Sequence, residues 1–362
     1  MRSIHPETAA RANSPPAGSA TDPPGDSAAQ WRLHRGGRLL YWGLLAPLAA
    51  LLPSKLAYRT ACAWGDLTYR IWANRDSELA YLRHLRDELG IDAIPDDVEG
   101  WARDFWRFRA CEVIDVMRLR GQARSLSRLV DIQGQEHLEK ALADGRGAIL
   151  CSAHFGSYLS AFSLLQVGGF PITCLGRWDW NYHEELSQVE RRFWDLVFAR
   201  RVLRHRQRPN IEPWMGRAQV AAQAATLLRK NEVVMICSDA PPIAADQARA
   251  VAVPFLGQRA RLLPGVVTLA KVTGAPLLMA FAHRRDDYRH QVLTISPPVP
   301  LDDDPQAVFA RCAEAMDSAI RRSPCDWYFW FQRDDLAGLG LLPPDDALLN
   351  RRQPAYTSGE SS

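Results

Sequence analysis

The chain has 362 residues, of which 47% are hydrophobic and 23% charged, a composition typical of a globular protein with one large domain or two smaller ones. Its formal net charge is only +3, so overall charge gives no support to a nucleic-acid-binding role. Seven cysteines are scattered without a C-x-x-C pair, which argues against a zinc site and is most simply explained by a reducing compartment. We therefore expect neither a bound metal nor a nucleic-acid partner.

The N-terminal part divides into a polar tail and a helical region. Residues 1–30 are rich in Pro, Ser, Ala and Gly, so we predict a disordered tail. These residues lack the apolar core of a signal peptide, so we do not expect them to be a cleaved signal peptide. Residues 31–130 are predicted to form several amphipathic helices rich in Trp and Arg.

Segment 36–56 of this region is rich in leucine. Its apolar run is shorter than the ~20 residues that a spanning helix needs, and Pro47 interrupts it. Basic residues flank the run, with Lys55 and Arg59 on the C-terminal side, and Tyr41 and Trp42 lie near its start. This combination predicts a segment that associates with the cytoplasmic leaflet of a membrane, and the alternative is an ordinary buried helix.

Residues 131–340 show alternating strands and helices, which predicts an α/β domain. The expected strands are 148–153, 172–175, 232–238, 277–282 and 291–295. The expected helices are 138–143, 156–166, 183–203, 214–230, 262–273 and 305–322, and a proline-containing loop is expected at 240–261. The predicted fold is a mixed sheet with helices on both faces, followed by a flexible tail at 341–362.

Polar residues follow four of these strands. His154 and Asp239 each come directly after an apolar strand, and Arg177, Asn181 and Arg284 follow two others. Ligands and chemistry gather beyond the carboxyl ends of strands in α/β sheets, so we predict a site with His154 as a general base beside a carboxylate and cationic groups. The alternative for His154 is a core histidine that caps a strand, and for each arginine a solvated loop charge.

Several short blocks together resemble a known family. They lie at 133–138, 145–150, 154–156 (His-Phe-Gly), 177–181 (Arg177-x-x-x-Asn181), 238–242, 254–257, 263–265, 273–276 and 327–333. The set is similar to the bacterial lipid A late acyltransferases, of the lauroyl/myristoyl type, in the lysophospholipid acyltransferase superfamily. The resemblance implies transfer of a fatty acyl chain from an acyl carrier protein or coenzyme A thioester to a hydroxyl or amine of a lipid-like acceptor. It implies no further cofactor, and it places the protein at the cytoplasmic face of the inner membrane with acyl carrier protein and membrane lipid as partners.

The same resemblance implies roles for the site residues. His154 would be the general base, and backbone N–H groups around Gly156 and Ser157 would stabilise an oxyanion. Arg177, Asn181 and Arg284 would contact the substrates.

The chain departs from the family at one position. The His-x4-Asp/Glu motif has Leu159 in place of the acid. We therefore expect Asp239, at the end of another strand, to hold the histidine instead. If it does not, a catalytically silent scaffold that binds lipid or carrier protein is the alternative.

Two further alternatives concern the reaction. A serine hydrolase is disfavoured because no G-x-S-x-G sequence is present. An acyltransferase acting on an acceptor other than lipid A is compatible with the altered motif. The arginine-rich stretch 191–208 is either a solvated face or a docking surface for an acidic carrier protein or anionic lipid heads.

Overall fold

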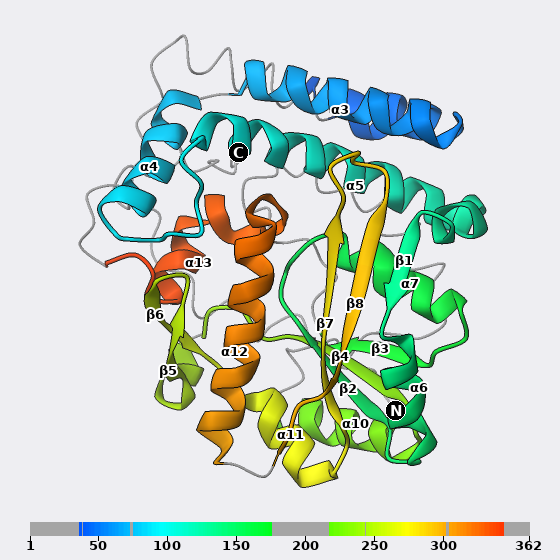
Figure 1. Ribbon diagram of the computed structural model, residues 1–362, viewed down its shortest axis with the longest axis vertical. Helices are drawn as coiled ribbons and strands as arrows, with labels where there is room; N and C mark the ends of the chain where they lie inside the picture. The colour runs from blue at the N-terminus through cyan, green and yellow to red at the C-terminus, as the bar shows by residue number, and fades with distance from the viewer. Residues whose placement is uncertain are drawn as a thin grey trace, which may run out of the picture.

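Six strands form one mixed sheet in the order β1-β8-β7-β2-β4-β3 (Figure 1). The strands are β1 (Val130–Gln133), β2 (Ala148–Ser152), β3 (Ile172–Leu175), β4 (Val233–Cys237), β7 (Leu277–Arg284) and β8 (Gln291–Pro298). Strands β7, β2, β4 and β3 run parallel to one another, whereas β8 is antiparallel to β7. The computed structural model describes residues 36–37, 39–72, 75–175, 217–242, 244–301 and 304–343.

Helices cover both faces of this sheet, as the alternating pattern predicted. Alternate residues of β2 point to opposite faces, with Ile149 and Cys151 in one apolar cluster and Ala148 and Leu150 in another. The first cluster includes α10 (Arg217–Arg229), α11 (Gly265–Thr273) and α12 (Pro305–Arg322), and the second includes α6 (Gln135–Ala143) and α7 (Tyr158–Val167). The α/β class and the mixed sheet are therefore confirmed.

The N-terminal helices pack beside one another at one end of the sheet. They comprise a π-helical turn (Tyr41–Leu45), α2 (Ala46–Ala50), α3 (Ser54–Arg70), α4 (Arg75–Asp87) and α5 (Val98–Ser127). Small residues let α3 approach α5 closely, because a Cβ at Gly65 would lie 2.6 Å from the backbone of Arg107. Figure 1 shows α3 and α5 side by side, above the tips of β7 and β8.

Helix α5 crosses the carboxyl end of β7. The Arg284 side chain, at the end of that strand, contacts Asp115 of α5, and Tyr288 in the following loop donates a hydrogen bond to Asp104 of α5 (2.5 Å). Within the described ranges, no helix combines the length and the apolar character needed to cross a membrane.

Two features of the fold differ from the sequence predictions. Strand β1 was not expected, because it is only four residues long and only half-buried at the sheet edge. The stretch around Pro254, expected to be a loop, forms a hairpin of β5 (Val251–Phe255) and β6 (Gln258–Leu262). Leu256 and Gly257 both have positive φ and make the tight turn of this hairpin. Pro254 pairs with Arg259 at a position of the antiparallel ladder that needs no backbone N–H from the proline.

Several predictions fall outside the described residues. They are the disordered tail at 1–30, the whole helix at 183–203, the arginine-rich stretch at 191–208, and all but the first residues of the tail at 341–362.

Candidate active site

The structure brings His154 and Asp239 together at the carboxyl edge of the sheet. His154 follows β2, Asp239 follows β4, and the two strands are parallel neighbours. The Nδ1 atom of His154 lies 2.7 Å from Oδ1 of Asp239, and the backbone N–H of His154 donates to Oδ2 at 2.8 Å. The two residues are 85 positions apart in the chain, so only the sheet places them in contact.

The carboxylate of Asp239 is fully buried and held by three donors. The third is the indole Nε1–H of Trp327, which lies 2.9 Å from Oδ2. A carboxylate accepts hydrogen bonds, so the neutral imidazole tautomer that fits this contact has its proton on Nδ1 and its lone pair on Nε2. In this tautomer the imidazole can accept a proton from a substrate through Nε2. The side chain of His154 is 14% exposed, so it reaches the protein surface.

The turn that carries His154 is fixed by the aromatic C-terminal block. The backbone N–H of Tyr328 donates to the carbonyl of His154 (3.1 Å), and the N–H of Gly156 donates to the carbonyl of Asp326 (2.8 Å). These two bonds make a short antiparallel bridge between residues 154–156 and 326–328. The N–H of Gly156 is therefore already used and is not available to an oxyanion, contrary to the prediction.

Gly156 is required by the geometry of this turn. Its φ is +62°, and a Cβ would lie 1.4 Å from the carbonyl oxygen of Ala282 on β7. Only glycine allows such a backbone approach.

Helix α7 begins directly after this turn and is almost wholly buried. Ser157 precedes its first residue, and its N–H has no acceptor among the described residues. Leu159 lies in the first turn of α7 and is buried. The position where the family motif would carry an acid is thus filled by an apolar side chain, while Asp239 supplies the carboxylate beside His154.

Arg284 lies in a different environment from the one expected. Its guanidinium is buried, forms an ion pair with Asp115 and donates to Oγ of Ser157 at 2.6 Å. Asp115 also accepts from Tyr58 (2.5 Å) and Gln291 (2.8 Å). Arg284 therefore supports the start of α7 from inside the protein and is not presented to a substrate.

Asp326 completes this buried polar layer. One of its carboxylate oxygens accepts the backbone N–H of Arg284 at 3.2 Å. Burial raises the pKa of Asp326 to about 7, although hydrogen bonding and the charge of Arg284 oppose the shift. Neither Asp115 nor Asp326 was singled out by sequence analysis, because their roles depend on contacts with residues far away in the chain.

Aromatic rings surround the imidazole. The ring of Phe329 lies 5.1 Å from that of His154 between centroids, and the ring of Tyr158 lies 5.8 Å away. The remaining two predicted site residues, Arg177 and Asn181, lie outside the described residues. Within the part of the chain that the structure describes, no three His, Cys, Asp or Glu side chains converge as a metal site would require.

A histidine oriented by a buried carboxylate at a sheet edge is an arrangement that is able to carry out general-base chemistry. The sequence model of the family described as bacterial lipid A biosynthesis acyltransferase matches residues 108–334, and the chain belongs to this family. The matched range contains His154, Asp239 and the aromatic block.

Curated relatives agree with this assignment. A lipid A biosynthesis acyltransferase of Haemophilus influenzae is 24% identical over 208 residues, which cover 57% of this chain and 59% of the relative. A phosphatidylinositol mannoside acyltransferase of Mycobacterium tuberculosis is 27% identical over 277 residues, which cover 73% of this chain and 79% of the relative. The chain is therefore similar to acyltransferases that differ in the lipid they are named for.

Proposed function

We propose that this protein transfers a fatty acyl group from an acyl carrier protein or coenzyme A thioester to a hydroxyl or amine of a lipid-like acceptor. The observation that carries the proposal is the 2.7 Å contact between His154 and the buried Asp239. This contact supplies the oriented base that the reaction needs even though residue 159 is leucine.

The chemistry follows from the tautomer that Asp239 imposes. Nε2 of His154 takes the proton from the acceptor O–H or N–H as the acceptor atom attacks the thioester carbonyl carbon. The tetrahedral intermediate collapses with cleavage of the C–S bond, and the imidazolium returns its proton to the departing thiolate. Asp239 stabilises the imidazolium between these two steps.

The oxyanion of this intermediate needs hydrogen-bond donors. The N–H of Ser157 is the donor we assign, because it lies at the start of α7 and makes no hydrogen bond within the described residues. The positive end of the helix dipole adds to this stabilisation.

The central test is a transfer assay with a radiolabelled thioester and a total membrane lipid extract. We expect His154→Ala to reduce transfer by at least ~10³-fold, since it removes the base. Full activity of this variant would exclude His154 as the base. If the wild-type protein binds carrier protein but neither releases the thiol nor acylates a lipid, a catalytically silent scaffold is the correct description. Separate reactions with acyl carrier protein and coenzyme A donors identify the donor.

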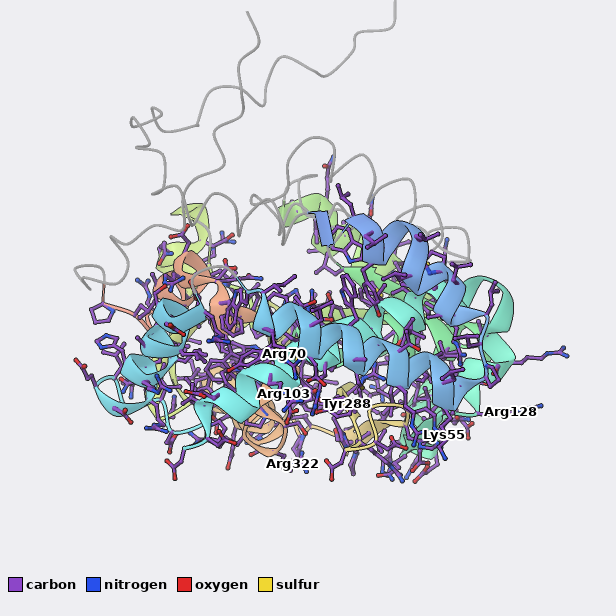
Figure 2. All side chains as sticks on the ribbon, turned by 90° about the horizontal axis from the view of Figure 1, so that it is seen from above. Lys55, Arg70, Arg103, Arg128, Tyr288 and Arg322 are labelled. Carbon is purple, nitrogen blue, oxygen red and sulfur yellow. The ribbon has the colours of Figure 1, made fainter. Side chains whose placement is uncertain are left out.

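We also propose that the protein docks on the cytoplasmic surface of the inner membrane through the leucine face of its first helices. This leucine face comprises Leu40, Leu44, Leu48, Leu51, Leu52 and Leu56, all exposed. The opposite side of these helices, with Ala46, Ala50 and Ala57, is buried against α5. Lys55, labelled in Figure 2, is an exposed residue at the start of α3 and directly precedes Leu56 in the chain, so its charge suits anionic lipid heads.

The membrane proposal is tested by flotation with phosphatidylglycerol vesicles. We expect the double variant Leu48→Asp/Leu51→Asp to bind at least tenfold more weakly than the wild type. Val272→Asp is a matched control, because Val272 is 79% exposed but lies on α11, away from the leucine face. Equal binding by the two variants would exclude the leucine face as the docking surface.

A further inference from the structure

Helix α5 carries an ion pair that the proposed mechanism does not use. Nη1 of Arg109 lies 2.6 Å from Oε2 of Glu112, and the side chains are 24% and 12% exposed. The other carboxylate oxygen of Glu112 accepts the hydroxyl hydrogen of Tyr328. Burial raises the pKa of Glu112 to about 6, so its carboxylate is mostly ionised at pH 7.5.

Tyr328 connects this ion pair to the turn that carries His154, residues 154–156, which we call the catalytic turn. Its backbone N–H donates to the carbonyl of His154, and its ring packs 5.6 Å from that of Tyr158, which in turn contacts the imidazole. The guanidinium of Arg109 lies 4.3 Å from the centroid of the Tyr328 ring. One layer of aromatic rings therefore separates Arg109 and Glu112 from His154.

Stability alone does not account for this pair. Attraction within a desolvated ion pair is largely offset by the cost of removing both charges from water, so such a pair is weak evidence of a stabilising role. Both side chains nevertheless remain partly exposed, and each has hydrogen-bonding capacity beyond the contacts described.

The chemistry of the three side chains selects among ligands. A phosphate or carboxylate would be repelled by Glu112. A group with several hydroxyls can donate to Glu112 and accept from Arg109, and it can place its C–H surface against the rings of Tyr158 and Tyr328.

We propose that Arg109 and Glu112 bind the hydroxyl-rich head group of the acceptor and orient it toward His154, which makes them specificity-determining residues. This inference rests on the proposed function only in naming the bound group an acceptor. The binding itself can be measured without turnover.

The test is equilibrium dialysis of the full chain with radiolabelled octyl β-glucoside, below its micelle concentration, and with 1-octanol as the probe that lacks the sugar. We expect the wild type to bind the glucoside at least tenfold more tightly than octanol. Glu112→Gln and Arg109→Met should each lose this preference, whereas Arg109→Lys should recover part of it.

Asp104→Asn is the matched control. Asp104 lies on the same helix and also contacts an arginine, Arg107, and a tyrosine hydroxyl, that of Tyr288, but it has no described contact with the catalytic turn. This variant should keep the glucoside preference of the wild type.

Kinetics distinguish binding from a structural role. In Glu112→Gln the apparent KM for the acceptor lipid should rise at least tenfold, whereas Asp104→Asn, which leaves Arg109 and Glu112 unchanged, should keep the wild-type KM and the wild-type rate of thioester hydrolysis by water. Glucoside binding that is absent in the wild type, or unchanged in Glu112→Gln, would overturn the inference. Absence of thioester turnover in the wild type would instead reject the proposed function.

Discussion

Replacing Asp239 by asparagine tests the tautomer argument directly. In the wild type, Oδ2 accepts from the backbone of His154 and from Trp327, and Oδ1 faces the imidazole Nδ1. An asparagine oxygen that keeps the two donors at the Oδ2 position must turn its NH₂ group toward Nδ1. The imidazole then carries its proton on Nε2, where it can no longer accept one from the acceptor.

The expected consequence is a loss of about 10⁴-fold in the rate of acyl transfer, or about 5.5 kcal/mol of barrier. This magnitude is taken from the corresponding substitution in serine proteases. Two of the three hydrogen bonds are kept, so the midpoint of thermal unfolding should change by only a few degrees. Single-turnover transfer with a labelled thioester measures the rate, and circular dichroism measures the unfolding midpoint. A folded Asp239→Asn variant that retains more than a tenth of wild-type activity would refute the role assigned to Asp239.

Three other substitutions probe the structure around the site. Gly156→Ala should destabilise the protein by at least ~3 kcal/mol in urea unfolding, because its Cβ would overlap the carbonyl of Ala282; a soluble variant of normal stability would contradict the close approach. Arg284→Met should cost about 3–5 kcal/mol, since it leaves Asp115 charged and buried without its cation, and a loss below 1 kcal/mol would argue against the ion pair. The raised pKa of Asp326 means that the folded state binds one more proton than the unfolded state between about pH 4 and pH 7, so the unfolding free energy contributed by this group falls as the pH rises through that range. Asp326→Asn should remove this fall, so the variant should be more stable than the wild type at pH 8, by up to about 4 kcal/mol, but not at pH 4. If the unfolding free energies of the two proteins change in parallel with pH, the raised pKa of Asp326 is excluded.

The two carboxylates near the active site illustrate different kinds of predictability. Asp239 could be proposed from the sequence because it follows an apolar strand, and neighbouring parallel strands bring their ends together. Asp115 could not be, because it lies in the middle of a long helix, and nothing local indicates that Arg284, 169 residues away, will be buried against it.

The arginine itself shows the limit of the same reasoning. A position after a strand places a side chain near the sheet edge but does not specify whether it faces a substrate or the interior. Arg284 faces the interior because α5 packs across β7. The helix supplies the carboxylate of Asp115 that pairs with Arg284, and it helps to shield the arginine from solvent.

The hairpin β5–β6 was missed because of a proline. Pro254 lowered the expectation of a strand, yet it occupies a pairing position that needs no N–H from it. Local sequence does not reveal which side of a strand its partner will occupy.

The sequence by itself determined five of the strands of the sheet, the presence of helices on both of its faces, and the two residues, His154 and Asp239, that meet at its carboxyl edge. These features depend on hydrophobic periodicity and on residues at strand ends, which are local properties of the chain. The tertiary structure alone decided that Trp327 holds Asp239, that the N–H of Gly156 is used by Asp326, and that Arg109 and Glu112 lie near His154. Each of these depends on how distant segments pack, since burial and hydrogen-bond partners belong to the assembled fold and not to any single stretch of sequence.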